Sequence, residues 1–360
     1  PAQPAAKGEI LVGLDLPITG AGASETPFIR KAAGLAQKQI NDAGGINGKM
    51  IKLIEEDNQT TNPGALAAMQ KSVEQDKVLV LLGPSRSTMV LAMSDAVKQY
   101  GIPTTIGGTN ATLTSQGNPW LFRIRPDDSI AAYAMVSYIK NEMNLTKIGI
   151  LHDSDAFGTG GADLVEQYAK QLGGLTIVKR EKYTSHDKDY TAQLLSLKSA
   201  GTEIMVVYGT NPDDVAVVMR QYRQLGSPYK YIGSPSSGSK DTLNLAKDAV
   251  NGLLCIQDYV PGATPESQQY IESYKKAYNE DIDTLFGFNY DALRILAEGI
   301  KAGGEDRSKI REAILNLKGF KSQLGTFDFT PNGDGLHQVA VSQIDNGSFK
   351  LMKVVQQPPR

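Results

Sequence analysis

Apolar residues along the chain form short strand-like runs that alternate with helix-like stretches and glycine-rich breaks. Residues 77–109 read KVLVLLGPSRSTMVLAMSDAVKQYGIPTTIGGT, and residues 203–234 read EIMVVYGTNPDDVAVVMRQYRQLGSPYKYIGS. In each segment a β-rich run ends at a glycine, a helix-like stretch follows, and a second short run ends at another glycine. The glycines that end the two runs are equally spaced in both copies, Gly83 with Gly107 and Gly209 with Gly233.

A strand, a helix and a strand in this order predict a βαβ unit, which builds parallel sheet. Two α/β lobes of similar design predict a cleft between them, lined by the loops that follow the strands. Candidate functional residues are therefore expected in such loops, at residues 85–88, 107–109, 211 and 234–237.

The same alternation predicts most other elements. In the first half we expect strands over residues 10–15, 51–55, 78–82 and 103–106, with helices over 26–42, 62–75 and 88–100. In the second half we expect helices over 130–142 and 161–172, and strands over 147–152 and 175–179.

Three segments are expected to cross between the lobes: residues 119–126, 252–260 and 327–335. Helices near 265–278, 289–302 and 308–317 would pack onto the first lobe, and the β-rich tail 338–355 onto the second. The predicted fold is thus α/β, with two similar Rossmann-like lobes of parallel sheet joined by a three-segment hinge. The first lobe takes residues 8–124 and 259–328, the second 125–258 and 329–355, and residues 1–7 and 356–360 are flexible ends.

Composition narrows the function classes. The 37 basic and 39 acidic residues give a net charge of −2, with no dense basic stripe, so nucleic acid is not an expected partner. The single cysteine, Cys255, lies in an apolar run and is expected to be a buried, inert thiol. No apolar stretch approaches the roughly 20 residues that span a bilayer, so no membrane insertion is expected. The first seven residues suggest the leader of a mature chain whose signal peptide has been removed.

Enzyme motifs are partial. The Gly83-Pro84-Ser85-Arg86-Ser87 segment has serine where a nucleophile elbow ends in glycine, and His152 is the sole plausible base for Ser85 or Ser87. No phosphate loop is present, and a calcium loop beginning at Asp328 lacks its final glutamate. We expect no enzyme activity, no cofactor and no metal, and keep a hydrolase as the alternative from a different class.

Hydroxyl groups collect at the predicted edge of the first sheet. Ser87 and Thr88 fall in the first turn of a helix, where free backbone N–H groups favour an anion, and Thr109 follows the next strand. This neutral cradle suits a carboxylate. The plain structural alternative is that Ser87 is a helix cap and Thr109 a turn residue.

The order and spacing of several motifs resemble the periplasmic solute-binding proteins of branched-chain (hydrophobic) amino-acid ABC importers, which have the type I fold. The resemblance covers residues 8–355. The motifs are the glycines around Gly20, Asn41-x-x-Gly44-Gly45-Ile46-x-Gly48, Asp57, Gly83-x-x-x-Ser87, Pro103-x-x-x-Gly107-Gly108-Thr109-x-x-x-Leu113-Thr114, Phe122-Arg123, and Phe157-Gly158-x-Gly160.

The resemblance implies roles for individual residues. Ser87, with Thr88 beside it, and Thr109 would bind a ligand carboxylate, and the backbone carbonyl of Gly107 would help to hold an ammonium. Gly108, the next residue, is also expected among the ligand-binding residues. Glu25 and Phe157 would line the side-chain pocket, and the loop around Asn211 would close it. Ser236, in the loop after the strand that ends at Gly233, is also expected to bind the ligand.

One position departs from the family. The acid that pairs with the ligand ammonium aligns with Pro235, followed by Ser236 and Ser237. Because an unpaired buried ammonium is costly, either Glu25 supplies the charge or the ligand has no ammonium. The expected ligand is a hydrophobic amino acid. The alternative is an aromatic or aliphatic carboxylate, which Phe157, Phe286 and Phe288 would face.

The resemblance therefore implies an extracytoplasmic, periplasmic or membrane-tethered binding protein that closes about its hinge on a small carboxylate. It is expected to act as a monomer and to deliver its ligand to a membrane permease. A ligand-sensing domain of a receptor or repressor would share the fold, but would normally be joined to a membrane helix or a DNA-binding segment, and the sequence contains neither.

Overall fold

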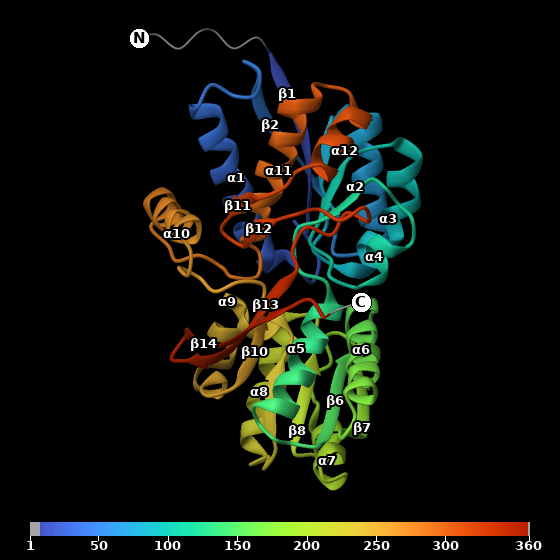
Figure 1. Cartoon of the computed structure of the whole chain (residues 1–360), viewed down its shortest axis with the longest axis vertical. Helices are drawn as coiled ribbons and strands as arrows, with labels where there is room; N and C mark the ends of the chain where they lie inside the picture. The colour runs from blue at the N-terminus through green and yellow to red at the C-terminus, as the bar shows by residue number, and fades with distance from the viewer. Residues whose placement is uncertain (1–7, 359–360) are drawn as a thin grey trace. The chain divides into compact units, whose positions relative to one another are not determined.

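A computed structural model describes residues 8–358, and the contacts within it divide the chain into two compact units (Figure 1). Unit 1 contains residues up to Arg125 and Pro261–Leu336, and unit 2 contains Pro126–Val260 and the residues from His337 onward. The predicted flexible end 1–7 lies outside the described residues. The predicted flexible end at 356 begins too early, because Gln356 still pairs with Gln338 in the last hairpin.

Unit 1 is built on a five-stranded parallel sheet of order β2-β1-β3-β4-β5. Its strands are β1 (Glu9–Leu16), β2 (Met50–Asp57), β3 (Val80–Leu82), β4 (Thr104–Ile106) and β5 (Leu121–Arg123). Its helices are α1 (Thr26–Asp42), α2 (Asn62–Glu74), α3 (Ser87–Tyr100), α4 (Thr112–Ser115), α10 (Pro265–Tyr278), α11 (Phe288–Gly303) and α12 (Arg307–Leu315). A small hairpin joins β11 (Phe320–Ser322) to β12 (Gly325–Phe327).

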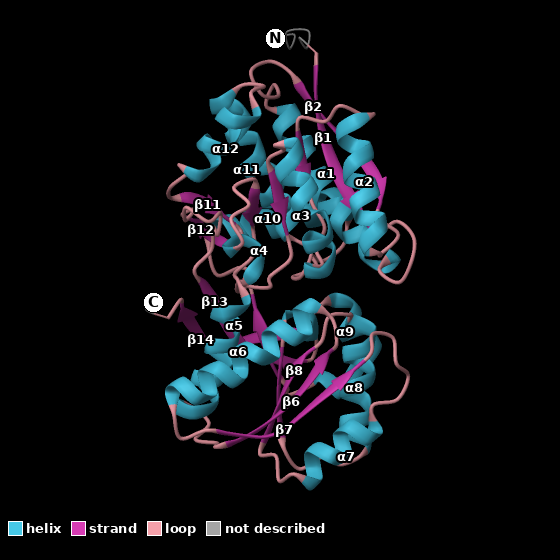
Figure 2. Ribbon diagram, turned by 90° about the vertical axis from the view of Figure 1, so that its right-hand side faces the viewer, coloured by secondary structure: helices cyan, strands magenta, loops and turns pink. Residues whose placement is uncertain are grey.

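Unit 2 has a seven-stranded sheet of order β14-β13-β10-β9-β8-β6-β7 (Figure 2). Its strands are β6 (Lys147–Asp153), β7 (Thr176–Tyr183), β8 (Ile204–Tyr208), β9 (Lys230–Gly233), β10 (Leu254–Gln257), β13 (Gln338–Asp345) and β14 (Ser348–Gln356). Its helices are α5 (Asp128–Asn141), α6 (Ala156–Leu172), α7 (Thr191–Ser199), α8 (Pro212–Gln224) and α9 (Lys240–Ala246). Strands β13 and β14 are antiparallel to their neighbours, and the other five strands are parallel.

The two units share one strand order. The parallel strands of unit 2, taken in chain order, lie as second, first, third, fourth and fifth, which is also the order in unit 1. The repeated segments form β3-α3-β4 and β8-α8-β9. The prediction of two similar α/β lobes is therefore confirmed, with an antiparallel pair added at one edge of the second.

Burial on both faces explains the continuous apolar runs of the strands. Along β8, Ile204, Val206 and Tyr208 pack into one core cluster, with side chains of α5 and α6. The alternate residues Met205 and Val207 pack into a second cluster, with side chains of α7 and α8. Helices therefore cover both faces of this sheet, as Figure 2 shows.

Helix α6 begins earlier than predicted, at Ala156 instead of near Gly161. Three glycines in its first turns weaken the sequence signal for a helix. The carboxylate of Asp155 compensates, because it accepts a hydrogen bond from the N–H of Gly158 (2.8 Å) and so caps the helix. Gly161 is needed for packing, since a Cβ there would lie 2.1 Å from a ring atom of Tyr208.

The chain changes unit after Arg125, Val260 and Leu336. The last change comes later than the predicted boundary at 328–329, because residues 329–336 pack in unit 1. The Phe329 ring meets the Phe122 ring edge-on at 5.9 Å, and the buried guanidinium of Arg123 pairs with Asp334 (2.8 Å). No helix among residues 8–358 is long and apolar enough to cross a membrane.

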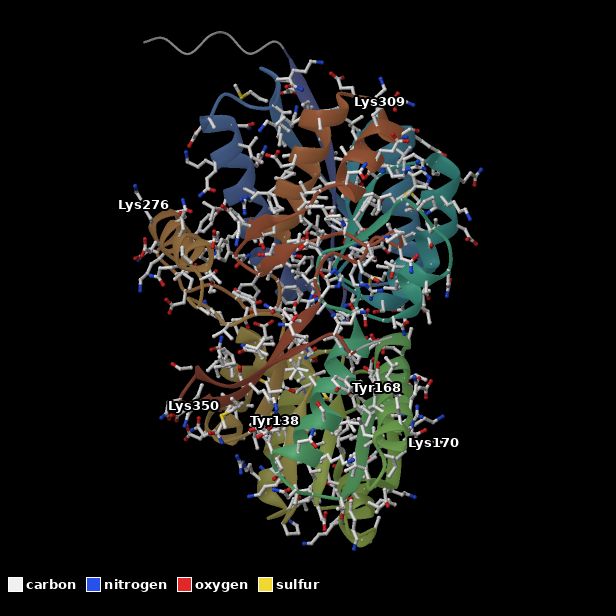
Figure 3. All side chains as sticks on the ribbon, in the orientation of Figure 1. Tyr138, Tyr168, Lys170, Lys276, Lys309 and Lys350 are labelled. Atoms are coloured by element: carbon white, nitrogen blue, oxygen red, sulfur yellow. The ribbon has the colours of Figure 1, made fainter. Side chains whose placement is uncertain are left out.

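Lysine side chains are spread over separate elements. Figure 3 labels four exposed lysines, Lys170 on α6, Lys276 on α10, Lys309 on α12 and Lys350 on β14.

Candidate functional site

The first candidate site lies in unit 1, where β3 and β4 end beside the start of α3. Ser87 is the first residue of α3, with Thr88 next to it, and Thr109 follows β4. Ser87 and Thr109 are 2% and 4% exposed, and the Ser87 Oγ accepts a hydrogen bond from the N–H of Asn110 (3.2 Å). The structure therefore brings the predicted hydroxyl groups of Ser87 and Thr109 to one edge of the sheet.

Both hydroxyl protons remain available. Within residues 8–358, neither Ser87 Oγ nor Thr109 Oγ1 donates a hydrogen bond to a protein acceptor, although both residues are buried. The first backbone N–H groups of α3 also lack partners within the helix. Buried donors that converge in this way suit an anion with several acceptor atoms, such as a carboxylate.

Two glycines allow this close approach. A Cβ on Gly108 would lie 3.1 Å from the Cα of Ser87, and a Cβ on Gly107 would lie 2.3 Å from the Phe288 ring. Any larger residue would push the loop after β4 away from α3 or from α11. The segment Gly107–Thr109 is thus held against both helices.

Buried Arg123 fixes the loop that follows Thr109. Its guanidinium donates to the carbonyl of Asn110 (2.8 Å), to Thr114 Oγ1 (2.7 Å) and to Asp334 Oδ1 (2.8 Å). Each bond involves a charged donor, which makes it stronger than a neutral bond. Arg123 therefore positions the loop without itself reaching the hydroxyl cradle.

Arg125 is the residue that sequence reasoning missed. Its Nη1 donates to the carbonyl oxygen of Gly107 (3.2 Å), and its guanidinium lies over the Phe288 ring, 5.8 Å from the centroid. Arg125 is 6% exposed. The signal in the sequence was a basic residue in the short apolar segment that ends the sheet, which we interpreted only as a crossing strand.

Glu25 is buried, 4% exposed, at the end of the short 3₁₀ turn Ala23–Glu25. Its carboxylate forms an ion pair with Arg86, the residue just before α3. The structure therefore brings Glu25 to the same helix start as Ser87, but with its charge already opposed by a guanidinium. A bond from Glu25 to a ligand ammonium stays a prediction.

The second candidate site lies in unit 2, at the ends of β6, β8 and β9. Phe157, in the first turn of α6, is 8% exposed and packs against Tyr208 with ring centroids 5.4 Å apart. Asp155 caps the same helix and accepts a hydrogen bond from Thr210 Oγ1 (2.8 Å). Thr210 thus links the loop after β8 to the start of α6.

Ser236 belongs to the 3₁₀ turn Pro235–Gly238 after β9, and its Oγ donates to the carbonyl of Thr210 (3.2 Å). Asn211 precedes α8 and is 2% exposed. The predicted residues Phe157, Asn211 and Ser236 are therefore brought to one edge of the sheet in unit 2. None of these three side chains is acidic, so none of them replaces the ammonium-pairing acid that the family resemblance expects at Pro235.

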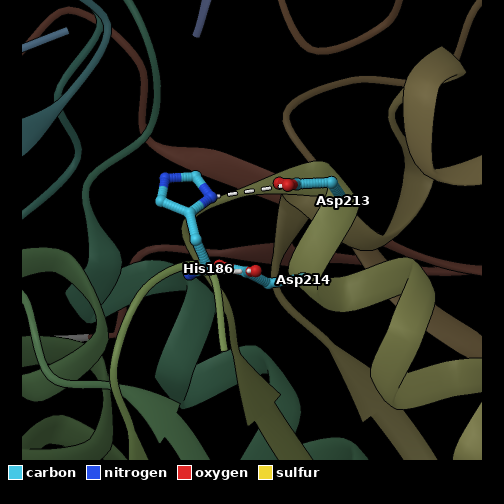
Figure 4. A group of neighbouring side chains, drawn as sticks. All are labelled: His186, Asp213 and Asp214. Carbon is cyan, nitrogen blue, oxygen red and sulfur yellow. Dashed lines mark hydrogen bonds and ion pairs between the residues drawn. The ribbon is translucent and has the colours of Figure 1, made fainter. Parts of the chain in front are cut away.

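His186, Asp213 and Asp214 have ligand atoms within 4.8 Å of one another, the spacing of a possible metal site (Figure 4). The Asp214 carboxylate already accepts from the N–H of His186 (3.0 and 3.1 Å) and from Asn211 Nδ2 (2.9 Å). Both acids also lie in the first turn of α8, where carboxylates stabilise the helix dipole. The group is thus explained as a helix-start arrangement that holds the His186 loop.

His152 is poorly suited to act as a base. Its Nδ1 lies 2.7 Å from the carbonyl oxygen of Asp153, so this nitrogen carries the proton, and Nε2 accepts from Arg180 Nε (3.0 Å). The lone pair that a general base would use is therefore occupied. Burial also lowers the pKa of His152, and the nearby Arg180 charge adds to this effect.

The model of the periplasmic binding protein family matches residues 9–348. The chain belongs to this family. It is 28% identical over 329 residues to the "Leu/Ile/Val-binding protein homolog 1" of Brucella suis, covering 91% of this chain and 87% of that protein. Such proteins bind solutes for transport and are not enzymes.

Several solved structures have the same fold as this chain. A leucine-binding protein from Thermotoga maritima superposes with a TM-score of 0.88 at 24% identity, covering 96% of this chain and 99% of that chain. A solute-binding protein of an ABC transporter from R. palustris, solved with benzoate, also gives 0.88, at 20% identity and 98% coverage of both chains. Proteins with this fold therefore include one named for leucine binding and one solved in complex with benzoate.

Proposed function

We propose that this family member is the extracytoplasmic solute-binding component of an ABC importer and that it carries a small organic carboxylate with an apolar body. The observation that carries the proposal is the pair of buried hydroxyl donors, Ser87 and Thr109, beside the start of α3. A carboxylate accepts several hydrogen bonds and so matches these donors and the adjacent backbone N–H groups.

Residues of unit 2 complete the site in this proposal. Phe157 contacts the apolar body of the ligand, and the loops of Asn211 and Ser236 close over it. A membrane permease then recognises the ligand-bound protein, which acts as a monomer in the periplasm or tethered to the membrane. In this proposal, closure takes place about the three points at which the chain changes unit, after Arg125, Val260 and Leu336.

Two ligand classes meet this description. Hydrophobic amino acids are supported by the names of the relatives in Brucella suis and Thermotoga maritima. Aromatic or aliphatic acids without an ammonium are supported by Pro235, by the Glu25–Arg86 ion pair and by the benzoate bound to the R. palustris protein.

Thermal unfolding in the presence of single compounds tests the proposal. A panel of hydrophobic amino acids, aromatic acids and aliphatic acids is compared with sugars and polyamines of equal concentration. A ligand at 100 times its dissociation constant stabilises the fold by about 2.7 kcal/mol, which is readily measured as a rise in melting temperature. Stabilisation by sugars or polyamines but by no carboxylate would contradict the proposal.

A further inference from the structure

We propose that Gln257, the last residue of β10 in unit 2, binds a neutral polar group on the body of the ligand. The ligand is then a small carboxylate whose apolar body carries a group that both donates and accepts hydrogen bonds, as a hydroxyl does. This inference rests on the proposed function, since it assumes that the ligand contacts the edge of unit 2 at which Phe157, Asn211 and Ser236 lie.

Gln257 is a buried amide without a protein partner. It is 3% exposed, and within residues 8–358 neither its Nε2 nor its Oε1 takes part in a hydrogen bond. A donor and an acceptor are thus removed from water together, which destabilises a fold unless another group bonds to them. Buried side-chain amides in folded proteins nearly always have such partners. The residue at this position is therefore not explained by the packing of unit 2 alone.

The strand pairing places Gln257 at the same edge of the sheet as the candidate residues of unit 2. Strands β6, β8, β9 and β10 are parallel neighbours, so their carboxyl ends meet at one edge. Phe157 follows β6, Asn211 follows β8 and Ser236 follows β9 at this edge. Ligands of parallel α/β sheets bind beside the carboxyl ends of the strands. Gln257 ends the next strand along, which gives it the equivalent position.

The side chain of Gln257 lies on the face of the sheet that carries the 3₁₀ turn Pro235–Gly238. Successive residues of a strand point to opposite faces, so Gln257 shares the face of Cys255. Cys255 packs into the core cluster that contains side chains of α7 and α8, and its Sγ would lie 3.4 Å from a Cβ on Gly238. Gln257 is two residues nearer to the carboxyl edge, and therefore lies at the end of the turn that carries Ser236.

The chemistry of the amide selects the group that it would bind. The hydroxyl groups at the turn are already bonded to other protein atoms: Ser234 Oγ to the Gly209 carbonyl (3.1 Å), Ser236 Oγ to the Thr210 carbonyl (3.2 Å) and Ser237 Oγ to the Tyr231 hydroxyl (2.9 Å). The Gln257 amide offers two protons and one acceptor oxygen. A second carboxylate on the ligand would only accept, and an ammonium would only donate, so each would leave half of the amide unmatched. A hydroxyl group does both, and it carries no charge into the buried position.

The experiment compares four pairs of carboxylates in which the second member carries a hydroxyl group: valine with threonine, phenylalanine with tyrosine, 3-methylbutanoate with 3-hydroxybutanoate, and 3-phenylpropanoate with 3-(4-hydroxyphenyl)propanoate. Isothermal titration calorimetry gives the dissociation constant of each compound with the wild-type protein. We expect the hydroxylated member to bind at least about tenfold more tightly in at least one pair. Binding without such a preference in any pair overturns the inference and leaves the proposed function standing.

Variants assign the preference to the amide of Gln257. Gln257→Leu keeps a side chain of similar size and removes the amide, so the ratio within the preferred pair should fall to about threefold or less. The melting temperature of this variant without ligand should be unchanged or higher, because a buried group without a partner is lost. Gln343→Leu is the matched control. Gln343 faces Leu254 at the other end of β10, and its Nε2 donates to the Gly252 carbonyl (3.2 Å), so the control should keep the ratio and melt at a slightly lower temperature.

The outcomes separate the two claims. An unchanged ratio in Gln257→Leu overturns the inference, and a lower melting temperature of that variant would then show that the fold itself uses the amide. If Gln257→Leu does not fold, the ratio of Gln257→Met, which has an unbranched apolar side chain, decides in the same way. Failure of all eight compounds to bind to the wild-type protein overturns the proposed carboxylate site itself, and the inference with it.

Discussion

At the scale of single residues, the hydroxyls of Ser87 and Thr109 are the groups whose removal should be felt most in binding. We predict that the double change Ser87→Ala and Thr109→Ala weakens carboxylate binding by more than about 100-fold, because a bond to a charged acceptor contributes roughly 1.5–3 kcal/mol. The apo protein should lose only about 1 kcal/mol, mainly through the bond from the Asn110 N–H to Ser87.

Calorimetric titration of the double variant checks the loss of carboxylate binding. Its thermal unfolding without ligand checks the small loss of stability. Ser115→Ala is the matched control, since Ser115 is an exposed hydroxyl residue of α4 in the same unit. Normal binding by the double variant would place the carboxylate elsewhere.

Asp15 is a second residue with a measurable effect, here on stability. It is 3% exposed in β1, Oδ1 accepts from Asn58 and Oδ2 has no hydrogen-bond partner. Burial raises the pKa of Asp15 to about 7, and the nearby Asp57 charge acts in the same direction. The bond from Asn58 acts against this shift.

Because the folded-state pKa lies above the unfolded value of about 3.9, the folded protein holds the proton more tightly. The stability that the protonated Asp15 contributes is therefore fully present near pH 4 and is lost as the pH rises towards 7. Asp15→Asn should match the wild type near pH 4 and exceed it at pH 8, by at most about 4 kcal/mol. Urea unfolding at several pH values measures the difference, with exposed Asp42→Asn as control. Parallel pH curves for wild type and Asp15→Asn would contradict the raised pKa.

At the scale of elements, the contact of α6 with β8 depends on one glycine. Gly161→Ala places a methyl group 2.1 Å from the Tyr208 ring, which also packs at a tilt against the Phe157 ring. We predict a loss of roughly 1–3 kcal/mol in the free energy of unfolding, the usual effect of overpacking.

Chemical unfolding compares this variant with Gly34→Ala. Gly34 lies inside α1, where a Cβ would make only an ordinary 3.6 Å contact with the Tyr278 hydroxyl. The alanine there should be neutral or stabilising by up to about 1 kcal/mol, through helix propensity. Equal stability of the two variants would mean that the Tyr208 ring shifts at little cost.

Most elements were predictable because their signals are local. Helix α1 begins with Thr26 and Pro27, so its start is visible in the sequence. Strand β8 is a continuous apolar run between polar breaks, so its extent is visible as well. The meeting of Ser87 with Thr109 also followed, since parallel strands end at one edge of a sheet.

The charges around this cradle were not predictable from the sequence. The Glu25–Arg86 pair joins segments 61 residues apart, and the bond from Arg125 to Gly107 depends on how β5 ends beside β4. The late unit boundary has a similar cause, because the packing of Phe329 on Phe122 is a tertiary contact without a local pattern. Such contacts decide the electrostatics of a site. Because the sequence gives no sign of the pair with Arg86, it predicts that Glu25 is available to a ligand.

At the scale of the whole molecule, each unit is made of segments distant in the sequence. Strand β13 pairs with β10, Ile256 facing Val341, and Val339, Val341 and Val355 are buried in the core cluster of unit 2. We predict that residues 126–260 alone do not fold cooperatively, because removing the last hairpin uncovers this core. Joining residues 337–358 through a flexible linker should restore a cooperative transition.

Thermal unfolding followed by circular dichroism distinguishes the two chains. The control replaces the apolar side chains Val339, Val341 and Val355 by serine in the joined chain, which keeps its length but removes the buried contacts. A cooperative transition for residues 126–260 alone would show that the hairpin is an addition to a core that is already complete.

The interleaved segments have a consequence for how the protein is made. A ribosome releases β1 to β5 first, yet α11, which packs on α1 and on β3 and β4, follows only after the whole of residues 126–260. The hairpin of β13 and β14, which completes the other sheet, follows later still in the chain. A growing chain therefore carries uncovered apolar surface in unit 2 until β13 and β14 have left the ribosome, and the core of that unit can be completed only after this step.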